Sequence, residues 1–360
     1  MTTGGVIAVH IGAGYHSPTK EGDYKRLCKV ACAKGIDMLQ SSASSLVTLV
    51  SVMKILEDDP LTNAGSGSNL TLHGTVECDA SIMDGKGRMF GAVGALQGIK
   101  NPIEAANCLL GEQLKGKLSM GRVPPCFLVS NGARQFARDH GIKEALPGTM
   151  TTENALKSYK KYKRQLSECS VNHEAPSAKK RQEESCLLMD TVGAICLDTN
   201  GNISSAVSSG GIVLKHPGRV GHAAMFGCGC WSENVKDDKV GIACSTTGCG
   251  EQIMRTNLAQ KCCQNVQAKD NPIEAVQETF TQDFKSSQLL CNDSEKLGGA
   301  LLVSYDQNNA ELVWAHTTES MCFGYMSTRD KSPKVKMSRL PSGSKCGESL
   351  CLGGCLFKLS

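Results

Sequence analysis

The chain lacks the sequence features of membrane, secreted and zinc-binding proteins. No apolar run among its 360 residues approaches the roughly 18 residues that a membrane-spanning helix needs. Residues 1–14 contain neither a basic segment nor a long apolar core, so we expect no signal peptide. The 19 cysteines are odd in number and scattered, and no two have the Cys-x-x-Cys spacing of zinc ligands. These absences predict mostly buried free thiols in a reducing compartment, with no membrane span and no metal.

A nucleotide cofactor and extensive nucleic-acid binding are also not expected. The stretch from Gly12 to Ser17 resembles a dinucleotide-binding loop, but Ser17 stands where that loop requires its third glycine. The net charge of +4 is confined to one segment, because eight basic and two acidic residues give +6 between residues 157 and 181 and leave about −2 elsewhere. We therefore expect no organic cofactor and no direct contact with nucleic acid.

What the chain does contain is a globular composition, with 40% hydrophobic and 21% charged residues. Apolar periodicity and turn signals predict strands at 6–10, 76–83, 90–96, 126–129, 191–197, 203–208, 240–245, 298–305, 311–317 and 321–327. They predict helices at 23–40, 44–57, 102–111, 131–140, 250–265 and 272–282. Strands, helices and strands in two successive halves favour an α/β fold with stacked inner sheets and outer helices, forming a single domain over residues 1–360.

Between about residues 145 and 186 the apolar residues become sparse and the charges cluster. No hydrophobic period persists there, which predicts a partly helical, flexible basic linker. Strong patterning resumes at Asp190-Thr191-Val192-Gly193. A threonine that begins a buried strand becomes an N-terminal nucleophile if the preceding bond is cut, because its freed α-amine can deprotonate its own hydroxyl. Without cleavage the same residues would form only a turn and an ordinary strand.

Three polar, glycine-rich turns follow the possible nucleophile. They contain Ser209, then Arg219 in Pro-Gly-Arg-Val-Gly, then Thr247 and Gly248 in Thr-Thr-Gly-Cys-Gly. Each alone is typical of an ordinary turn. The last turn lies between a predicted strand and a predicted helix, where free backbone N–H groups can bind an anion or a developing oxyanion.

These segments, in this order, resemble the type 2 asparaginase family of N-terminal-nucleophile hydrolases. The segments that carry the resemblance span nearly the whole chain and are residues 10–17, 61–69, 77–85, 190–193, 216–221, 228–231 and 316–322. Within the family, Cys-Gly-Cys-Trp at 228–231 and His-Thr-Thr-Glu-Ser-Met-Cys at 316–322 are similar to the threonine aspartase (taspase) branch.

The resemblance implies a four-layer αββα sandwich whose precursor cuts itself between Asp190 and Thr191. An α subunit of residues 1–190 and a β subunit of residues 191–360 would result, and such heterodimers commonly pair again. No cofactor is implied. The residues carried over are Thr191 as nucleophile, Ser209 beside it, Thr247 and Gly248 at the oxyanion hole, Arg219 on a substrate carboxylate, and Lys20, Gly12 and Asn63 completing the pocket.

One departure from the family pattern bears on the substrate. Small-molecule asparaginases place an aspartate three residues after the arginine to bind a free α-ammonium group, and here that residue is His222. Loss of this ionic hydrogen bond, worth roughly 1.5–3 kcal/mol, would weaken binding of a free amino acid. Together with Asp190 before the cleaved bond, this favours an autoprocessing threonine endopeptidase that cleaves nuclear protein substrates after aspartate.

The basic clusters of the linker are typical of a bipartite nuclear import signal. They are Lys160, Lys161, Lys163 and Arg164, followed by Lys179, Lys180 and Arg181. An import receptor as partner, and a location in nucleus and cytoplasm, are the corresponding expectations. A solvated charged helix would have the same composition.

Two other functions fit the same residues. The first is a small-molecule L-asparaginase or isoaspartyl peptidase, which hydrolysis of asparagine would distinguish from cleavage of an Asp-Gly peptide. The second is a catalytically silent nuclear scaffold that keeps the fold and uses the basic linker for contacts. Intact Thr191, Arg219 and Gly248 speak against the scaffold.

Overall fold

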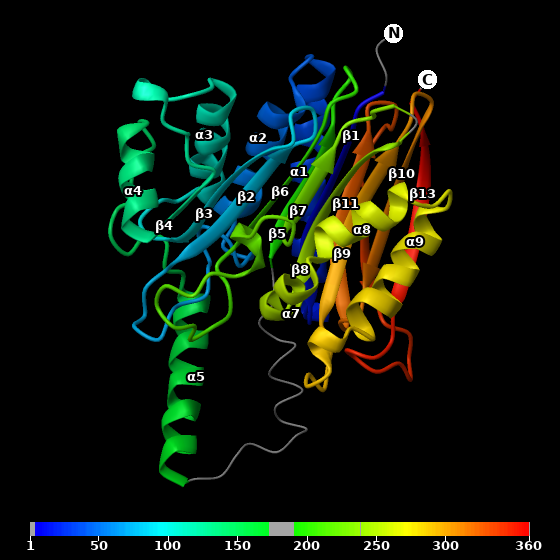
Figure 1. The fold of residues 1–360 in the computed structure, drawn as a ribbon. Coiled ribbons are helices and arrows are strands. Elements are labelled where there is room, and N and C mark those ends of the chain that lie inside the picture. The colour runs from blue at the N-terminus through cyan, green and yellow to red at the C-terminus, as the bar shows by residue number, and fades with distance from the viewer. Residues whose placement is uncertain (1–3, 173–190, 238, 360) are drawn as a thin grey trace.

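Helices enclose a pair of stacked β-sheets in the computed structural model of the protein (Figure 1). The structure describes residues 4–172, 191–237 and 239–359. From one outer face to the other, the layers are helices, the larger sheet, the smaller sheet and helices, which is the expected αββα arrangement. The sheets touch through β5 and β6 of one and β7 and β8 of the other, so the start of β5 lies deep inside the molecule.

The larger sheet is antiparallel except where β3 pairs with β4. Its strand order is β12 (Lys334–Arg339), β11 (Ser320–Ser327), β1 (Val6–Gly14), β5 (Val192–Leu197), β6 (Ile203–Ser209), β2 (Cys78–Asp84), β3 (Met89–Leu96) and β4 (Phe127–Val129). The order of the smaller, antiparallel sheet is β13 (Cys351–Lys358), β10 (Asn309–His316), β9 (Gly298–Tyr305), β8 (Gly241–Gly248) and β7 (Cys230–Glu233).

Each outer face is covered by helices that pack on its central strands. On the larger sheet lie α1 (Glu21–Gln40), α2 (Ser45–Asp58), α3 (Pro102–Leu114) and α4 (Ser130–Asp139). On the smaller sheet lie α7 (Gly250–Thr256), α8 (Leu258–Gln267) and α9 (Pro272–Glu278), and a π-helical segment, Thr279–Lys285, continues α9. Because both faces of the central strands are covered, β1, β5 and β6 are buried along their whole length.

Helix α5 (Glu153–Asn172) projects away from the body of the molecule (Figure 1). It lies within the predicted linker, whose helical part is therefore longer than its weak apolar pattern indicated. The second basic cluster, at residues 179–181, and Asp190 lie outside the described residues. No helix in the described ranges is long and apolar enough to cross a membrane. The cysteines that the structure describes are free thiols, and most of them are buried.

Three predictions of local structure were wrong, each for a tertiary reason. The strand predicted at 6–10 ends too early: β1 continues to Gly14 past a register shift between His10 and Ala13. The single helix predicted at 250–265 is broken at Asn257, whose φ of 50° lies in the left-handed region. Strands β12 and β13 were missed because their cysteines, glycines and alternating charges give little apolar signal, and pairing with β11 and β10 creates them.

Candidate active site

Thr191 lies immediately before β5, at one end of the central strands of the larger sheet. Its side chain is buried, with 3% of the residue exposed. The Thr191 hydroxyl donates a hydrogen bond to Ser209 Oγ over 3.1 Å, and Ser209 Oγ also accepts from the backbone N–H of Gly211 over 3.0 Å. Strand pairing of β5 with β6 brings these residues together across 18 positions of sequence. The hydroxyl of the predicted nucleophile is therefore held in one orientation.

A buried histidine, His10, is hydrogen-bonded to the backbone of Thr191. His10 Nδ1 donates to the Thr191 carbonyl oxygen over 3.1 Å, and Ser245 Oγ lies 2.9 Å from Nε2. Burial lowers the pKa of His10 to about 3, against the effect of the Thr191 hydrogen bond, so the ring is neutral at pH 7. Gly193 leaves room for it, because a Cβ there would come within 2.3 Å of His10 Nε2. This contact could not be predicted from the residues around His10, which form an ordinary apolar run.

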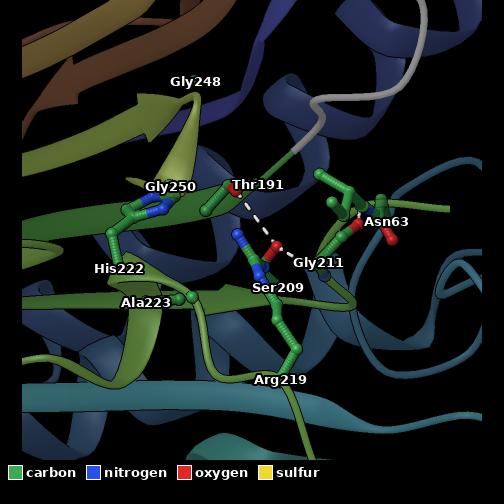
Figure 2. A pocket seen from close by; sticks show the side chains of 11 residues that line it. Asn63, Thr191, Ser209, Gly211, Arg219, His222, Ala223, Gly248 and Gly250 are labelled. Carbon is green, nitrogen blue, oxygen red and sulfur yellow. Dashed lines mark hydrogen bonds between the residues drawn. The ribbon is translucent and has the colours of Figure 1, made fainter. Parts of the chain in front are cut away.

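The pocket beside Thr191 collects residues from both sheets and from the loop that follows β6. Figure 2 shows Thr191, Ser209, Arg219 and His222 around the same space. The complete lining is Asn63, Thr191, Ser209, Gly211, Ile212, Arg219, Gly221, His222, Ala223, Gly248 and Gly250. Five predicted site residues thus meet in one pocket, although they come from three distant parts of the sequence: Asn63, Thr191, Ser209, Arg219 and Gly248.

Arg219 supplies a positive charge to this pocket, and its side chain is only 15% exposed. Nε and Nη2 both donate to Glu251 Oε1, over 2.9 and 2.7 Å. Two glycines allow the guanidinium to lie so close to the backbone, because a Cβ at Gly221 or Gly250 would fall 2.7 Å from Nη1 or Nη2. A planar guanidinium can bind both oxygens of a carboxylate, so Arg219 fits an anionic substrate group.

His222 lies beside Arg219 as a buried, neutral ring. Burial and the nearby Arg219 charge lower the pKa of His222 to about 4. Its Nε2 lies 3.3 Å from the Thr246 carbonyl oxygen, which only accepts, so the neutral ring carries its proton on Nε2. Nδ1 is then a hydrogen-bond acceptor on the side of Gly250, which lines the pocket. His222 therefore brings an acceptor to this place, but no negative charge.

The predicted oxyanion turn lies at the end of β8. Gly248 lines the pocket with a φ of 128°, and a Cβ there would come within 2.5 Å of the Leu297 carbonyl oxygen. Thr247 is completely buried and is not part of the lining. Its hydroxyl accepts a hydrogen bond from the backbone N–H of Ala13 over 3.1 Å, which ties the turn to β1. Of the pair, Gly248 is the one that borders the reacting space.

The remaining predicted site residues have supporting or distant positions. Asn63 lines the pocket, but its amide is engaged: Nδ2 donates to the Gly211 carbonyl over 2.7 Å, and Oδ1 accepts from the Asn69 N–H over 2.8 Å. Gly12 lies in the register shift of β1, outside the lining. Lys20 is exposed in the 3₁₀ turn Pro18–Lys20 and does not line the pocket either.

The site offers no metal-binding group in the part of the chain that the structure describes. No cluster of three or more His, Cys, Asp or Glu side chains suitable for a metal ion occurs there. The polar groups that meet at the pocket are a hydroxyl nucleophile with a hydroxyl partner, a guanidinium, a neutral imidazole and a glycine turn. This set suits acyl transfer by a threonine to water, with binding of a carboxylate-bearing substrate.

Comparison with known proteins identifies a family with this chemistry. A model of the asparaginase family, Asparaginase_2, matches residues 3–335. The isoaspartyl peptidase/L-asparaginase of Mus musculus is 36% identical over 300 residues, which cover 83% of this chain and 82% of the relative. The human protein of the same name is 38% identical over 71% of this chain and 74% of its own length. The isoaspartyl peptidase of Escherichia coli K12 is 32% identical over the same shares.

These relatives contradict the predicted endopeptidase that cleaves nuclear proteins after aspartate, and the finer assignment to the taspase branch is not supported. All three are named isoaspartyl peptidases, and the mouse and human proteins are also named L-asparaginases. The prediction depended on His222 replacing an aspartate. In the structure a carboxylate does lie near His222, because Glu251, from α7, accepts two hydrogen bonds from Arg219.

The match over residues 3–335, the relatives and the αββα sandwich agree with one another, and the chain belongs to the type 2 asparaginase family of N-terminal-nucleophile hydrolases.

Proposed function

We propose that the protein is a self-cleaving L-asparaginase and isoaspartyl peptidase that uses Thr191 as its nucleophile. The observation that carries this proposal is the meeting of the Thr191 hydroxyl, the Arg219 guanidinium and the Gly248 turn in one pocket. The names of the relatives support the substrate class. In both L-asparagine and β-aspartyl peptides, the amide to be cleaved is formed by the side-chain carboxyl group, and the α-amino and α-carboxylate groups are free. One pocket can therefore accept both.

Maturation would begin with an acyl shift at the Asp190–Thr191 bond. The Thr191 hydroxyl oxygen attacks the Asp190 carbonyl carbon, the C–N bond breaks, and the Asp190 acyl group is transferred from nitrogen to oxygen as an ester. Water then hydrolyses the ester and leaves an Asp190 carboxylate and a Thr191 α-amine. A free α-amine has a reference pKa of about 7.7–8.0, close to the working pH, which suits a general base.

In the catalytic cycle, the α-amine accepts the proton of the Thr191 hydroxyl while the oxygen attacks the substrate's side-chain amide carbon. The Gly248 turn provides the place for the resulting oxyanion, and Ser209 Oγ, 3.1 Å from Thr191 Oγ1, keeps the hydroxyl oriented. The tetrahedral intermediate expels ammonia or the amine of the following residue, which takes the proton from the Thr191 ammonium. Water then cleaves the acyl-threonine ester and releases L-aspartate.

The experiment that tests this function uses the full chain. Denaturing gels and N-terminal sequencing should show two fragments, the second starting at Thr191. The matured protein should release L-aspartate from L-asparagine and from a β-aspartyl dipeptide. A persistent full-length band would contradict self-cleavage. Complete maturation without hydrolysis of either substrate would contradict the proposed activity while leaving self-cleavage intact.

Two further properties are proposals that extend the same picture. The α subunit (1–190) and β subunit (191–360) would remain associated after cleavage, because β1 of the first pairs with β5 and β11 of the second. Such heterodimers would pair again. For location, we propose a nuclear import signal that binds an import receptor. It would consist of the cluster at 179–181 and of the basic residues on the projecting helix α5, Lys160, Lys161, Lys163 and Arg164. Neutralising both clusters and imaging the protein would test it.

A further inference from the structure

The proposed substrates carry two charged groups, and Arg219 can bind only one of them. L-Asparagine and β-aspartyl peptides carry an α-carboxylate and, on the same carbon, an α-ammonium group. Arg219 fits the carboxylate, but a buried ammonium without an acceptor loses its hydration with nothing in return. His222 offers only a neutral acceptor on the side of Gly250. A negatively charged partner for the ammonium should therefore lie next to Arg219. This inference rests on the proposed function.

Glu251 is the carboxylate in that position. It follows Gly250, which lines the pocket, and its Oε1 accepts two hydrogen bonds from Arg219. These bonds use the Nε edge of the guanidinium. The other edge is turned toward pocket-lining glycines: Nη1 lies 3.0 Å from where a Cβ of Gly211 would be, and 2.7 Å from that of Gly221. Glu251 thus leaves one edge of Arg219 available to a substrate carboxylate.

The second oxygen of Glu251 retains the capacity to accept. Among the described residues, Oε2 accepts from the Cys249 thiol over 4.0 Å, and a thiol is a weak donor at this range. The Glu251 side chain is 47% exposed, so a ligand can reach it. Asp79 is the other carboxylate close to Arg219, but it is completely buried and accepts from the backbone N–H groups of Ala95 and Gly221. Neither carboxylate is part of the pocket lining itself, but Asp79 is buried behind the loop, whereas the partly exposed Glu251 adjoins the lining through Gly250 and through its bonds to Arg219.

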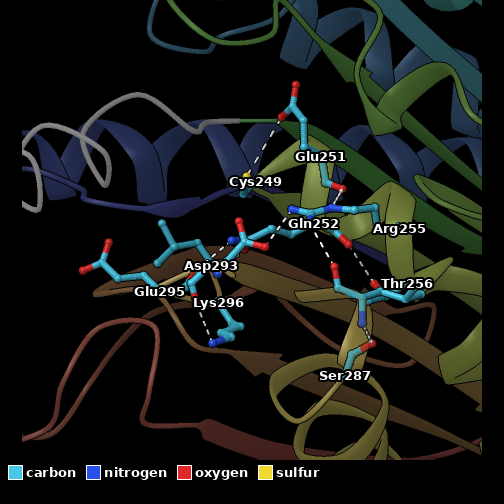
Figure 3. Close-up of polar contacts among 11 residues, drawn as sticks. Cys249, Glu251, Gln252, Arg255, Thr256, Ser287, Asp293, Glu295 and Lys296 are labelled. Carbon is cyan, nitrogen blue, oxygen red and sulfur yellow. Dashed lines mark hydrogen bonds and ion pairs between the residues drawn. The ribbon is translucent and has the colours of Figure 1, made fainter. Parts of the chain in front are cut away.

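The backbone that carries Glu251 is fixed in place by polar contacts along α7. Figure 3 shows these contacts around Gln252 and Arg255. Gln252 donates to the Glu295 carbonyl and accepts from the Leu297 N–H, each over 2.7 Å, and Arg255 pairs with Asp293 over 2.8 Å. The first turn of α7 is therefore anchored to residues 293–297. The Glu251 carboxylate therefore keeps a fixed position relative to Arg219.

We propose that Glu251 is the specificity-determining residue that binds the α-ammonium group of the substrate, in place of an aspartate at position 222. Arg219 and Glu251 together carry no net charge and present opposite charges side by side, which complements an α-amino acid zwitterion. An Nα-acylated substrate keeps its carboxylate but has no ammonium, so it would leave Glu251 without a cationic ligand and close to its acyl oxygen. The pocket thus selects for a free amino group.

The test compares one substrate with its amine-blocked form. The matured wild-type protein should hydrolyse a β-aspartyl dipeptide with a kcat/KM about 10- to 100-fold above that of its Nα-acetyl derivative, as expected for one ionic hydrogen bond. Glu251→Gln keeps an oxygen for Arg219 and removes only the charge, and it should lower this preference about tenfold or more. Glu278→Gln is the matched control, since it removes the charge of an exposed carboxylate that pairs with Lys269 at the end of α9 and does not line the pocket. It should leave the preference unchanged.

Binding gives a second measurement that does not require turnover. By calorimetry, the matured protein should bind L-aspartate more tightly than Nα-acetyl-L-aspartate, and Glu251→Gln should reduce the difference. Equal losses for both substrates in Glu251→Gln would mean that Glu251 only orients Arg219, which overturns the proposal. An unchanged preference, or no discrimination in binding, also overturns it. If neither substrate is hydrolysed but L-aspartate binds selectively through Glu251, the proposed activity fails and this inference stands.

Discussion

The two walls of the pocket, each taken with the residue that supports it from outside the lining, are built in different ways. The catalytic wall, defined as Thr191 and Ser209 with His10 behind them, lies within or next to paired strands of the larger sheet and contains no charged side chain. The recognition wall, defined as Arg219 and His222 with Glu251 paired to Arg219, comes from the loop after β6 and the first turn of α7. It contains an ion pair that is partly exposed to solvent.

This difference separates two requirements of the reaction. The nucleophile must keep its orientation within a fraction of an ångström, and strands paired on both sides provide that. Recognition of a charged substrate requires charges that a ligand can reach, and loop residues provide those. A residue on the recognition wall can therefore change, as at position 222, while the same charge reaches the site from another element. The following predictions test whether the two walls act separately, from the largest effect to the smallest.

Removing the nucleophile should have the largest effect and should be confined to the catalytic wall. Thr191→Ala removes the oxygen that attacks in both maturation and turnover. We expect an uncut full-length chain and a loss of at least about 10⁴-fold in kcat/KM. Gel analysis and aspartate release measure the two losses. Thr191→Ser is the matched control, because it retains the hydroxyl and should still mature. Fragmentation of the alanine variant at the same bond would show that another group performs the cleavage.

Changing the cation should affect recognition and spare maturation. Arg219→Lys retains the charge but loses the planar fork, so KM for L-asparagine should rise about 10- to 100-fold, or roughly 1.4–2.7 kcal/mol. The yield of the Thr191 fragment should stay the same. Arg134→Lys on α4, which alters a partly exposed ion pair with Glu144, serves as the control and should leave KM unchanged. A block of self-cleavage in Arg219→Lys would mean that the walls are not separable.

Low pH should destabilise the folded protein through the buried histidine beside each wall. His10 and His222 have folded-state pKa values of about 3 and about 4, below the ordinary value of 6.5. The unfolded chain therefore binds protons first as the pH falls, and stability decreases from about pH 6.5 down through those folded values. Between pH 6.5 and 5 each histidine should cost about 1.5 kcal/mol in the free energy of unfolding.

Denaturant titrations at several pH values measure this loss. For each variant, the free energy of unfolding is compared with its own value at pH 7. His10→Asn and His222→Asn should each lose the part of the pH dependence that the replaced histidine contributes. A variant with the full wild-type slope would show that the ring concerned is already protonated in the folded protein.

The hydroxyl partner of the nucleophile should have the smallest effect. Ser209→Ala removes a hydrogen-bond acceptor from both Thr191 and the Gly211 N–H. We expect about a fivefold loss in kcat, near 1 kcal/mol, with little change in KM. Ser204→Ala, whose hydroxyl contacts Ser45 on the outer helix layer, is the control. An effect on KM larger than that on kcat would assign Ser209 to the recognition wall.

The elements that were predicted correctly are those whose own residues carry the signal. The apolar runs of β1, β5 and β9 and the helical periodicity of α1 and α2 can be read from the residues of those segments alone. Strands β12 and β13 have no such pattern, because they become strands only by pairing at the sheet edges. Likewise, Ser209, Arg219 and Gly248 stand in recognisable glycine turns, whereas His10 and Glu251 have no local signal at all.

By itself, the sequence determined the chemistry that is available: a threonine that begins a buried strand, an arginine between glycines, and a glycine turn at the end of a strand. Its fold class follows from the same apolar periods. Tertiary structure alone decided which charges share the pocket. Glu251 lies 32 positions from Arg219, and His10 lies 181 positions from Thr191, yet sheet stacking and strand pairing place each within hydrogen-bond distance of its partner. Contacts of that kind arise from packing, which no local spacing of residues encodes.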